Sequence, residues 1–181
     1  MSAFVINRKV RLRIGFLFGI AYLVFARPTA GGLWLGLPVA FAGLLIRAWA
    51  AGHIVKNEQL TMTGPYAHSR NPLYFGSFLL AAGFALASHW SLLLVVIALF
   101  AFIYGPTIEL ERSQISARFP DDYARYEANV PAFTPRLTPW RGQSGAEPFS
   151  FSLYMRQREW QAGLAFVAAS AFLIARSHYG F

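Results

Sequence analysis

The chain has 181 residues, of which 56% are hydrophobic and only 13% are charged. Soluble domains have roughly 25% charged residues, so this chain cannot cover a globule of its size with polar surface, and lipid is its expected solvent. The net charge is +8, but no basic soluble module is present, so nucleic acid is not an expected partner. The absence of cysteine excludes disulfides, thiolate metal sites and a cysteine nucleophile.

Stretches without acidic or basic residues predict about five membrane-spanning helices. About 20 apolar residues cross a hydrocarbon core of ~30 Å. Residues 28–46 are long enough for one crossing and residues 71–108 for two, with a reversal expected at Ser-His-Trp-Ser, 88–91. The predicted helices are 11–27, 33–52, 72–87, 90–108 and 160–177. The expected fold is therefore an all-α polytopic membrane bundle that forms one domain over residues 1–181, with residues 141–150 linking into the last helix.

The charged residues predict the orientation of the bundle. The N-terminus carries Arg8, Lys9, Arg11 and Arg13, and the apolar run that follows ends in Arg27-Pro28 without a small-residue cleavage site, so it is expected to be a retained helix. Basic residues also concentrate in the 47–71 and 109–159 segments. The positive-inside rule places these three regions in the cytoplasm and the C-terminus outside. Seven of the eight acidic residues lie in 109–159, so one face of the membrane gathers nearly all titratable groups.

The first block whose residues could bind a ligand or take part in a reaction is Gly64-Pro65-Tyr66-Ala67-His68-Ser69-Arg70-Asn71-Pro72-Leu73-Tyr74. Pro72 is expected at the first turn of a helix, where unpaired peptide N–H groups favour an anion. Arg70 could add a bidentate contact to a carboxylate or phosphate. Alternatively, the Gly-Pro and Asn-Pro pairs are simple turn residues and Arg70 only sets the orientation of the protein.

The second block is Glu109-Leu110-Glu111-Arg112, at the expected cytoplasmic end of a helix. Two carboxylates at i and i+2 do not share a helix face, so one is expected to face the bundle and the other water. A carboxylate near the hydrocarbon boundary needs a partner, which favours a functional role. The alternative is a solvated helix end with Glu111 paired to Ser113 or a nearby arginine.

The third block runs from Phe119 to Tyr126 and continues into Val130-Pro131 and Pro135. Tyr123 and Tyr126 share a helix face and could pack over a cation or a purine. An amphipathic helix on the membrane surface is equally compatible with these residues and is favoured by the periodicity. The four histidines show no metal-binding spacing, so no metal site is expected. They are His53, His68, His89 and His178.

Taken in order, these blocks resemble the isoprenylcysteine carboxyl methyltransferase and phospholipid N-methyltransferase superfamily. The resemblance covers about residues 47–135, and the C-terminal helix at 160–177 is additional to this core. The family pattern is GPY-x-x-x-RHP-x-Y at a helix start, a helical hairpin, an acidic pair, F-G-x-x-Y-x-x-Y and V-P-x-x-x-P. The matching residues are Gly64, Pro65, Tyr66, Arg70, Pro72, Tyr74, Glu111, Phe119, Tyr123, Tyr126, Val130, Pro131 and Pro135.

The resemblance implies methyl transfer from S-adenosylmethionine to a lipophilic acceptor at the cytoplasmic membrane face, with membrane lipids as the other partners. It also implies a tunnel between helices that admits the acceptor from the bilayer. The implied catalytic residues are Arg70, Glu111 and Arg112. The implied cofactor-binding residues are Gly64, Pro65, Tyr66, Arg70, Asn71, Pro72, Tyr74, Glu109, Glu111 and Tyr123.

Three positions depart from the family pattern. Asn71 replaces the histidine of the RHP triplet and cannot titrate, Arg112 replaces the second acid, and Pro120 replaces the usual glycine. In the implied chemistry, Glu111 holds the ammonium or ribose of the cofactor and Arg70 its carboxylate. Two other functions remain open at this point: an NADPH-dependent membrane reductase of the sterol type, and a non-enzymatic membrane scaffold.

Overall fold

The computed structural model describes residues 8–54, 60–142 and 148–180, and within these ranges it is helical with no strand. The predicted all-α class is confirmed. The helices are α1 (Arg8–Phe25), α2 (Ala30–Ala51), the 3-10 turn η1 (Gly64–Ala67), α3 (Pro72–Ser88), α4 (Ser91–Leu99), the π-helical turn η2 (Phe100–Tyr104), α5 (Gly105–Arg118), α6 (Pro120–Asn129), α7 (Phe151–Arg156) and α8 (Trp160–Tyr179).

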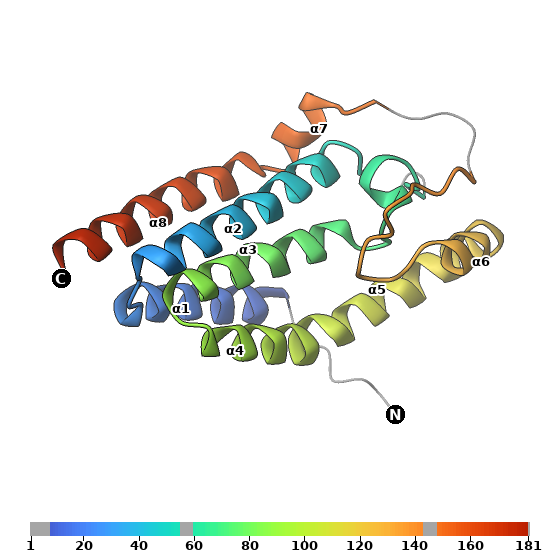
Figure 1. Cartoon of the computed structure of the whole chain (residues 1–181). Coiled ribbons are helices and arrows are strands. Elements are labelled where there is room, and N and C mark those ends of the chain that lie inside the picture. Colours follow the sequence, from blue (N-terminus) through green and yellow to red (C-terminus); the bar gives the residue numbers. More distant parts are fainter. Residues whose placement is uncertain (1–7, 55–59, 143–147, 181) are drawn as a thin grey trace.

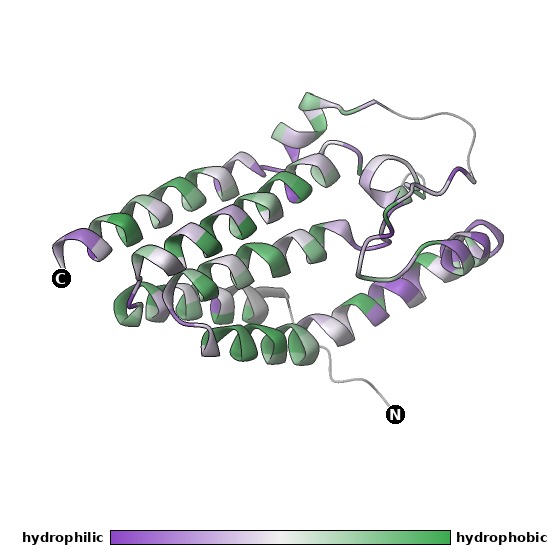
Figure 2. Cartoon of the chain, in the orientation of Figure 1, coloured by the Kyte–Doolittle hydropathy of each residue, from purple (hydrophilic) through white to green (hydrophobic). Residues whose placement is uncertain are grey.

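The helices α1, α2, α3, α4 and α8 lie alongside one another, and η1, α6 and α7 gather at one end (Figure 1). Three helices are long and apolar enough to cross a membrane, namely Ala30–Ala51, Ser91–Arg118 and Trp160–Tyr179. Two shorter apolar helices accompany them, Arg13–Phe25 and Pro72–Ser88. Hydrophobic residues dominate the bundle, whereas hydrophilic residues concentrate on α6 and the end of α5 (Figure 2). The chain is therefore a membrane helix bundle with one polar end.

The predicted reversal at 88–91 is confirmed, because α3 ends at Ser88 and α4 begins at Ser91. The predicted end of the next helix at 108 is wrong, because the helix continues through η2 and α5 to Arg118. The sequence criterion followed uninterrupted apolar residues, and these stop before Glu109. The helix does not stop there because its last turns project beyond the bundle, where polar residues are accommodated (Figure 2).

Glycines bring the backbones of α2 and α3 into direct contact. A Cβ atom on Gly36 would lie 2.3 Å from Gly83 O, and one on Gly83 would lie 2.2 Å from Ala40 N. A second contact lies about two turns away along both helices. There, a Cβ on Gly43 would lie 2.5 Å from Leu80 N, and one on Gly76 would lie 2.7 Å from Gly43 O. Small residues at such spacing let membrane helices approach closely, so α2 and α3 form the tightest pair of the bundle.

An ion pair joins α8 to this pair of helices. Arg47 of α2 donates to Glu159 through Nη2–Oε1 (2.6 Å), Nη2–Oε2 (2.9 Å) and Nε–Oε2 (3.1 Å), and also to Ser77 Oγ of α3. Glu159 immediately precedes α8. The side chains of Arg47 and Glu159 are only 22% and 13% exposed. The ion pair therefore links three helices at a position that is largely shielded from solvent.

We expect Arg47→Ala to lower the free energy of unfolding by about 2 kcal/mol, because it leaves the half-buried Glu159 carboxylate without its donor. Thermal unfolding in detergent, followed by circular dichroism, measures this loss. Arg27→Ala is the matched control, since Arg27 is exposed between α1 and α2. The double variant Arg47→Ala, Glu159→Ala should lose less than the sum of the single variants, and strict additivity would contradict the linkage.

The long α4–α5 helix widens at η2. Gly105 N–H donates to Phe100 O, five residues earlier, and Pro106 has no N–H with which to continue regular α-helical bonding. The widened turn stacks Phe100 on Tyr104, with ring centroids 4.4 Å apart, and sets Tyr104 against Tyr74 of α3 at 5.5 Å. Such π-helical turns often lie near functional sites, and this one lies between the bundle and its polar end.

Candidate active site

A cavity of about 490 Å³ opens at the polar end of the bundle, within the usual size range of small-molecule sites, ~300–1,000 Å³. One wall is the segment from α2 to the start of α3, and the other is formed by α5 and α6. The lining residues are Ile54, Leu60, Thr61, Tyr66, Arg70, Asn71, Ile108, Glu111, Arg112, Gln114, Ile115, Arg118, Phe119, Tyr123 and Tyr126.

The α5 wall follows from helical spacing. Ile108, Glu111, Ile115 and Arg118 recur every three or four residues and therefore share the face that lines the cavity. Glu109 lies off this face, and its side chain is 60% exposed. As the spacing of the two acids required, one carboxylate faces the cavity and the other faces away from it.

The Glu111 carboxylate is held by a tyrosine from the opposite wall. Tyr74 of α3 donates its hydroxyl to Glu111 Oε1 at 2.7 Å. The alternative in which Glu111 pairs with Ser113 is wrong, because Ser113 Oγ donates to Leu110 O. Arg112 donates instead to Glu109 at 2.7–2.9 Å. Glu111 thus keeps its second oxygen for a ligand or solvent.

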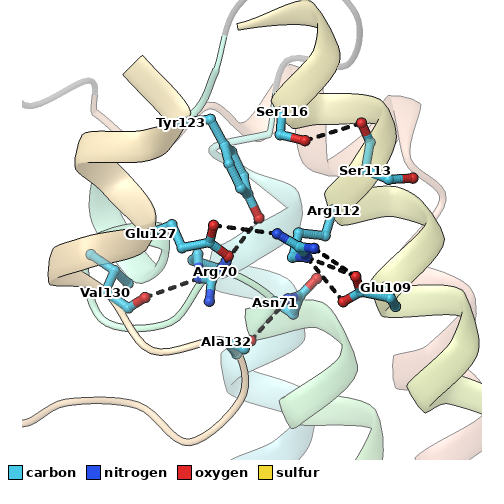
Figure 3. A network of polar contacts seen from close by, with 10 residues as sticks. All are labelled: Arg70, Asn71, Glu109, Arg112, Ser113, Ser116, Tyr123, Glu127, Val130 and Ala132. Carbon is cyan, nitrogen blue, oxygen red and sulfur yellow. Dashed lines mark hydrogen bonds and ion pairs between the residues drawn. The ribbon is translucent and has the colours of Figure 1, made fainter. Parts of the chain in front are cut away.

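Arg70 is the central side chain of the facing wall (Figure 3). It is 11% exposed, and its Nε donates to Val130 O at 3.0 Å while Nη1 donates to Tyr123 OH at 2.9 Å. Nη1 also forms an ion pair with Glu127. Each of these partners comes from α6 or the residue after it, so Arg70 fixes α6 over the cavity.

The segment after α6 returns along the 67–71 turn and fixes its backbone. Ser69 Oγ donates to Phe133 O at 2.8 Å, and Asn71 Nδ2 donates to Ala132 O at 2.9 Å. Arg70 N–H donates to Pro131 O at 2.9 Å. Three successive carbonyls of this segment, those of Pro131, Ala132 and Phe133, thus accept hydrogen bonds from the turn. Asn71 therefore serves as a hydrogen-bond donor at the position that the RHP triplet gives to histidine.

Glu127 is a site residue that the sequence analysis missed. Its carboxylate lies between two guanidinium groups, bonding Arg70 through Oε1 and approaching Arg112 Nη1 at 3.4 Å through Oε2 (Figure 3). The signal was present in the spacing, since Glu127 follows Tyr123 by four residues and so shares its helix face. Glu127 links α5, α6 and the Arg70 turn in one charged network.

Tyr66 lines the cavity, and its hydroxyl is buried. Its side chain is 7% exposed, and its hydroxyl has no hydrogen-bond partner among the residues that the structure describes. Buried tyrosine hydroxyls normally have a partner. Burial raises the pKa of the Tyr66 phenol above its usual value, and the nearby charge of Glu111 adds to the rise. Tyr66 therefore keeps its proton.

The other two cavity tyrosines are already engaged. Tyr126 donates its hydroxyl to Tyr66 O at 2.7 Å, and burial raises its pKa. The pKa of Tyr123 is also raised by burial, although the hydrogen bond from Arg70 opposes this rise. Both phenols thus remain neutral and position other residues of the wall.

The structure sorts the candidate residues into two groups. Six line the cavity: Tyr66, Arg70, Asn71, Glu111, Arg112 and Tyr123. The other five support them: Gly64 and Pro65 begin the turn that carries Tyr66, Pro72 begins α3, Tyr74 holds Glu111, and Glu109 holds Arg112. Three polar lining residues were missed, namely Thr61, Gln114 and Arg118.

Gly64 has a specific steric role at the start of this wall. Its φ is +57°, and a Cβ there would lie 2.5 Å from the His53 ring. Both facts favour glycine.

No cluster of three or more potential metal ligands occurs within residues 8–54, 60–142 and 148–180.

Comparison with known proteins identifies the family. The sequence model of the phospholipid methyltransferase family matches residues 29–122, which include α2, α3, α5 and the Arg70 turn. The chain is 29% identical over 129 residues to the protein-S-isoprenylcysteine O-methyltransferase of Schizosaccharomyces pombe, with 67% of this chain and 54% of that protein covered. No solved structure matches the chain significantly.

Two bacterial relatives are more similar. The cobalt-zinc-cadmium resistance protein CzcN of Cupriavidus metallidurans is 32% identical over 173 residues, with 87% of this chain and 78% of that protein covered. The nickel-cobalt-cadmium resistance protein NccN of Alcaligenes xylosoxydans xylosoxydans is 35% identical over 140 residues, with 74% and 63% covered. Their names identify no reaction. Because the family match spans more than half of the chain and most of the residues that line the cavity, this protein belongs to the phospholipid methyltransferase family of membrane methyltransferases.

Proposed function

We propose that the protein transfers a methyl group from S-adenosylmethionine to a lipophilic acceptor at the cytoplasmic face of the membrane. The observation that carries this proposal is the cavity between the Arg70 turn and the Glu111 face of α5, whose lining brings a carboxylate, guanidinium groups and an apolar surface together. The basic residues gathered at this end of the bundle support the cytoplasmic orientation.

The lining residues fit the chemistry of the cofactor. S-adenosylmethionine supplies an activated methyl group on a sulfonium and also carries an ammonium, a carboxylate and an adenosine. Glu111 provides a carboxylate for the ammonium or the ribose, and Arg70 provides a guanidinium group for the carboxylate of the cofactor. Ile108, Ile115 and Phe119 form an apolar surface suited to the adenine.

Within the cavity, the chain's role in an in-line displacement is alignment and exclusion of water. Reacting atoms must be held ~3–3.5 Å apart, which requires rigid walls of the kind that the Tyr74–Glu111 and Arg70–Glu127 contacts provide. Among the described lining residues there is no histidine, and Glu111 is the one carboxylate. This favours an acceptor that attacks without first losing a proton, such as a carboxylate, which Arg112 could orient.

Apolar cavities inside the bundle support a membrane route for the acceptor. A cavity of about 440 Å³ lies between α1, α3, α4 and α8. It shares Gly15, Phe18, Ala81 and Val96 with a smaller one of about 150 Å³ that ends at Tyr104. Tyr104 contacts Tyr74, which bonds Glu111. An acceptor tail in these cavities would thus extend toward the Glu111 end of the site.

Isothermal titration of S-adenosylmethionine into detergent-purified protein tests the proposal. We expect Glu111→Gln to weaken binding at least about tenfold, because it removes the charge that faces the ammonium. Tyr74→Phe should weaken binding less, because Glu111 stays but loses its fixed orientation. Asp122→Asn is the control, since the exposed Asp122 pairs with Arg125 on α6.

Equal heats from the wild type, Glu111→Gln and Asp122→Asn would reject this pocket as the cofactor site. Titration of NADPH in parallel tests the reductase alternative. Saturable binding of NADPH without binding of S-adenosylmethionine would reject methyl transfer by this chain.

A further inference from the structure

The short helix α7 presents an apolar face that no part of the described protein covers. Phe151 and Met155 are four residues apart, so they lie on the same side of the helix, and they are 67% and 44% exposed. Arg156 and Arg158 follow and are also exposed, and neither forms an ion pair within the described ranges. The outward surface of α7 is therefore both apolar and cationic.

The residues that lead into α7 are attached to the end of α2. Ser150 N–H donates to Gly52 O at 2.9 Å, and a Cβ on Gly52 would lie 2.1 Å from the ring of Phe149. The Phe149 ring also contacts the His53 ring, with centroids 6.1 Å apart. Because these contacts fix the start of α7 to the end of α2, the exposed Phe151 and Met155 side chains are carried by an anchored helix.

The backbone at Arg158 sets α7 apart from the membrane-spanning α8. Arg158 has φ of +58°, a left-handed conformation that is uncommon for residues other than glycine. It lies in the turn between the last residue of α7, Arg156, and the first residue of α8, Trp160, and α7 lies at an angle to α8 (Figure 1). Since α8 is a candidate span that begins at Trp160, we expect α7 at the level of the lipid headgroups.

We propose that α7 is a docking surface for anionic lipid headgroups, with Phe151 and Met155 inserted at the acyl boundary and Arg156 and Arg158 bound to phosphates. Basic amphipathic segments bind anionic membrane surfaces through this combination of apolar insertion and charge. A second copy of the chain is a poorer occupant, because a two-fold contact would bring these arginines against one another. The proposal does not depend on the methyl-transfer reaction.

The absence of cysteine allows a direct test by site-directed labelling. A nitroxide is attached to Met155→Cys in one variant and to Ala128→Cys, at an exposed position of α6, in another. Both proteins are reconstituted into vesicles of phosphatidylcholine alone or with added phosphatidylglycerol. Power saturation with oxygen and with a water-soluble nickel complex reports the depth of each label.

The Met155 label should be immersed and should move deeper when phosphatidylglycerol is present, whereas the Ala128 label should stay accessible to nickel in both vesicles. Adding Arg156→Gln and Arg158→Asn should abolish the phosphatidylglycerol-dependent shift. Asparagine tolerates the left-handed backbone at 158, and a thermal melt equal to that of the wild type verifies the fold.

Three results would overturn the proposal. The first is a Met155 label as accessible to nickel as the Ala128 label. The second is an immersion depth that does not respond to phosphatidylglycerol or to loss of the two arginines, since this would show insertion without anionic recognition. The third is spin–spin broadening that grows with protein density, which would identify a second copy as the occupant.

Discussion

Gly83→Ala should destabilise the bundle by about 3 kcal/mol, the upper end of the usual cost of overpacking. A Cβ at this position would lie 2.2 Å from Ala40 N and 2.5 Å from Gly36 O. Both atoms are backbone, so no side-chain rotation relieves the clash and α2 and α3 must move apart. Thermal unfolding in a mild detergent measures the loss.

Gly163→Ala is the matched control for this substitution. Gly163 also lies inside an apolar helix, α8, but a Cβ there would have no atom within 4 Å. The substitution should leave stability unchanged or slightly raised, because alanine favours helix. Melting temperatures that fall equally in the two variants would show that the α2–α3 contact does not carry the predicted stability.

Arg70→Ala should weaken S-adenosylmethionine binding by about 2 kcal/mol, roughly 30-fold in the dissociation constant. Two causes act together, because the variant loses a cavity cation and also frees α6 from the Val130, Tyr123 and Glu127 contacts. Titration calorimetry on folded, purified protein gives the affinity. Arg125→Ala is the control, since Arg125 is 71% exposed and pairs with Asp122 within α6.

Arg70→Lys separates the two causes. Lysine keeps the charge but cannot reproduce the guanidinium's simultaneous bonds to a backbone carbonyl, a phenol and a carboxylate. We expect it to bind better than Arg70→Ala and worse than the wild type. If both Arg70 variants fold and bind S-adenosylmethionine as the wild type does, Arg70 is a purely structural residue and its assignment to the cofactor is wrong.

The helical bundle could be predicted from the sequence because its signal is local. The apolar length of 71–108 required a hairpin, and the polar Ser88–Ser91 turn located it. The two acids at 109 and 111 were correctly assigned to different faces, since helical spacing decides this. Local rules failed where the apolar pattern ended. The helix continues to Arg118, and α7 occupies Phe151–Arg156, between the predicted link and the predicted last helix, where no helix was predicted.

The residues that were missed owe their roles to contacts distant in sequence. Glu127 meets Arg70 across 57 positions, and Glu159 meets Arg47 across 112. Nothing in the sequence near Glu159 distinguishes it from an ordinary solvated acid. Tyr66 was identified through a family pattern, but its unpartnered hydroxyl is a property of burial, which depends on how η1 and α6 meet.

The glycine contacts between α2 and α3 also predict that the amide protons of the two cavity walls exchange at different rates. The Arg70 wall is carried by α2 and α3, whose backbones are in contact. The amide hydrogen bonds of these two helices should therefore break only when the whole protein unfolds. The α5–α6 wall extends beyond the bundle, past the widened turn at 100–104, and sub-global opening there requires breaking few contacts. Hydrogen–deuterium exchange should therefore be slow along Gly36–Gly43 and Gly76–Gly83 and faster through α6, and a bound ligand should slow mainly the second.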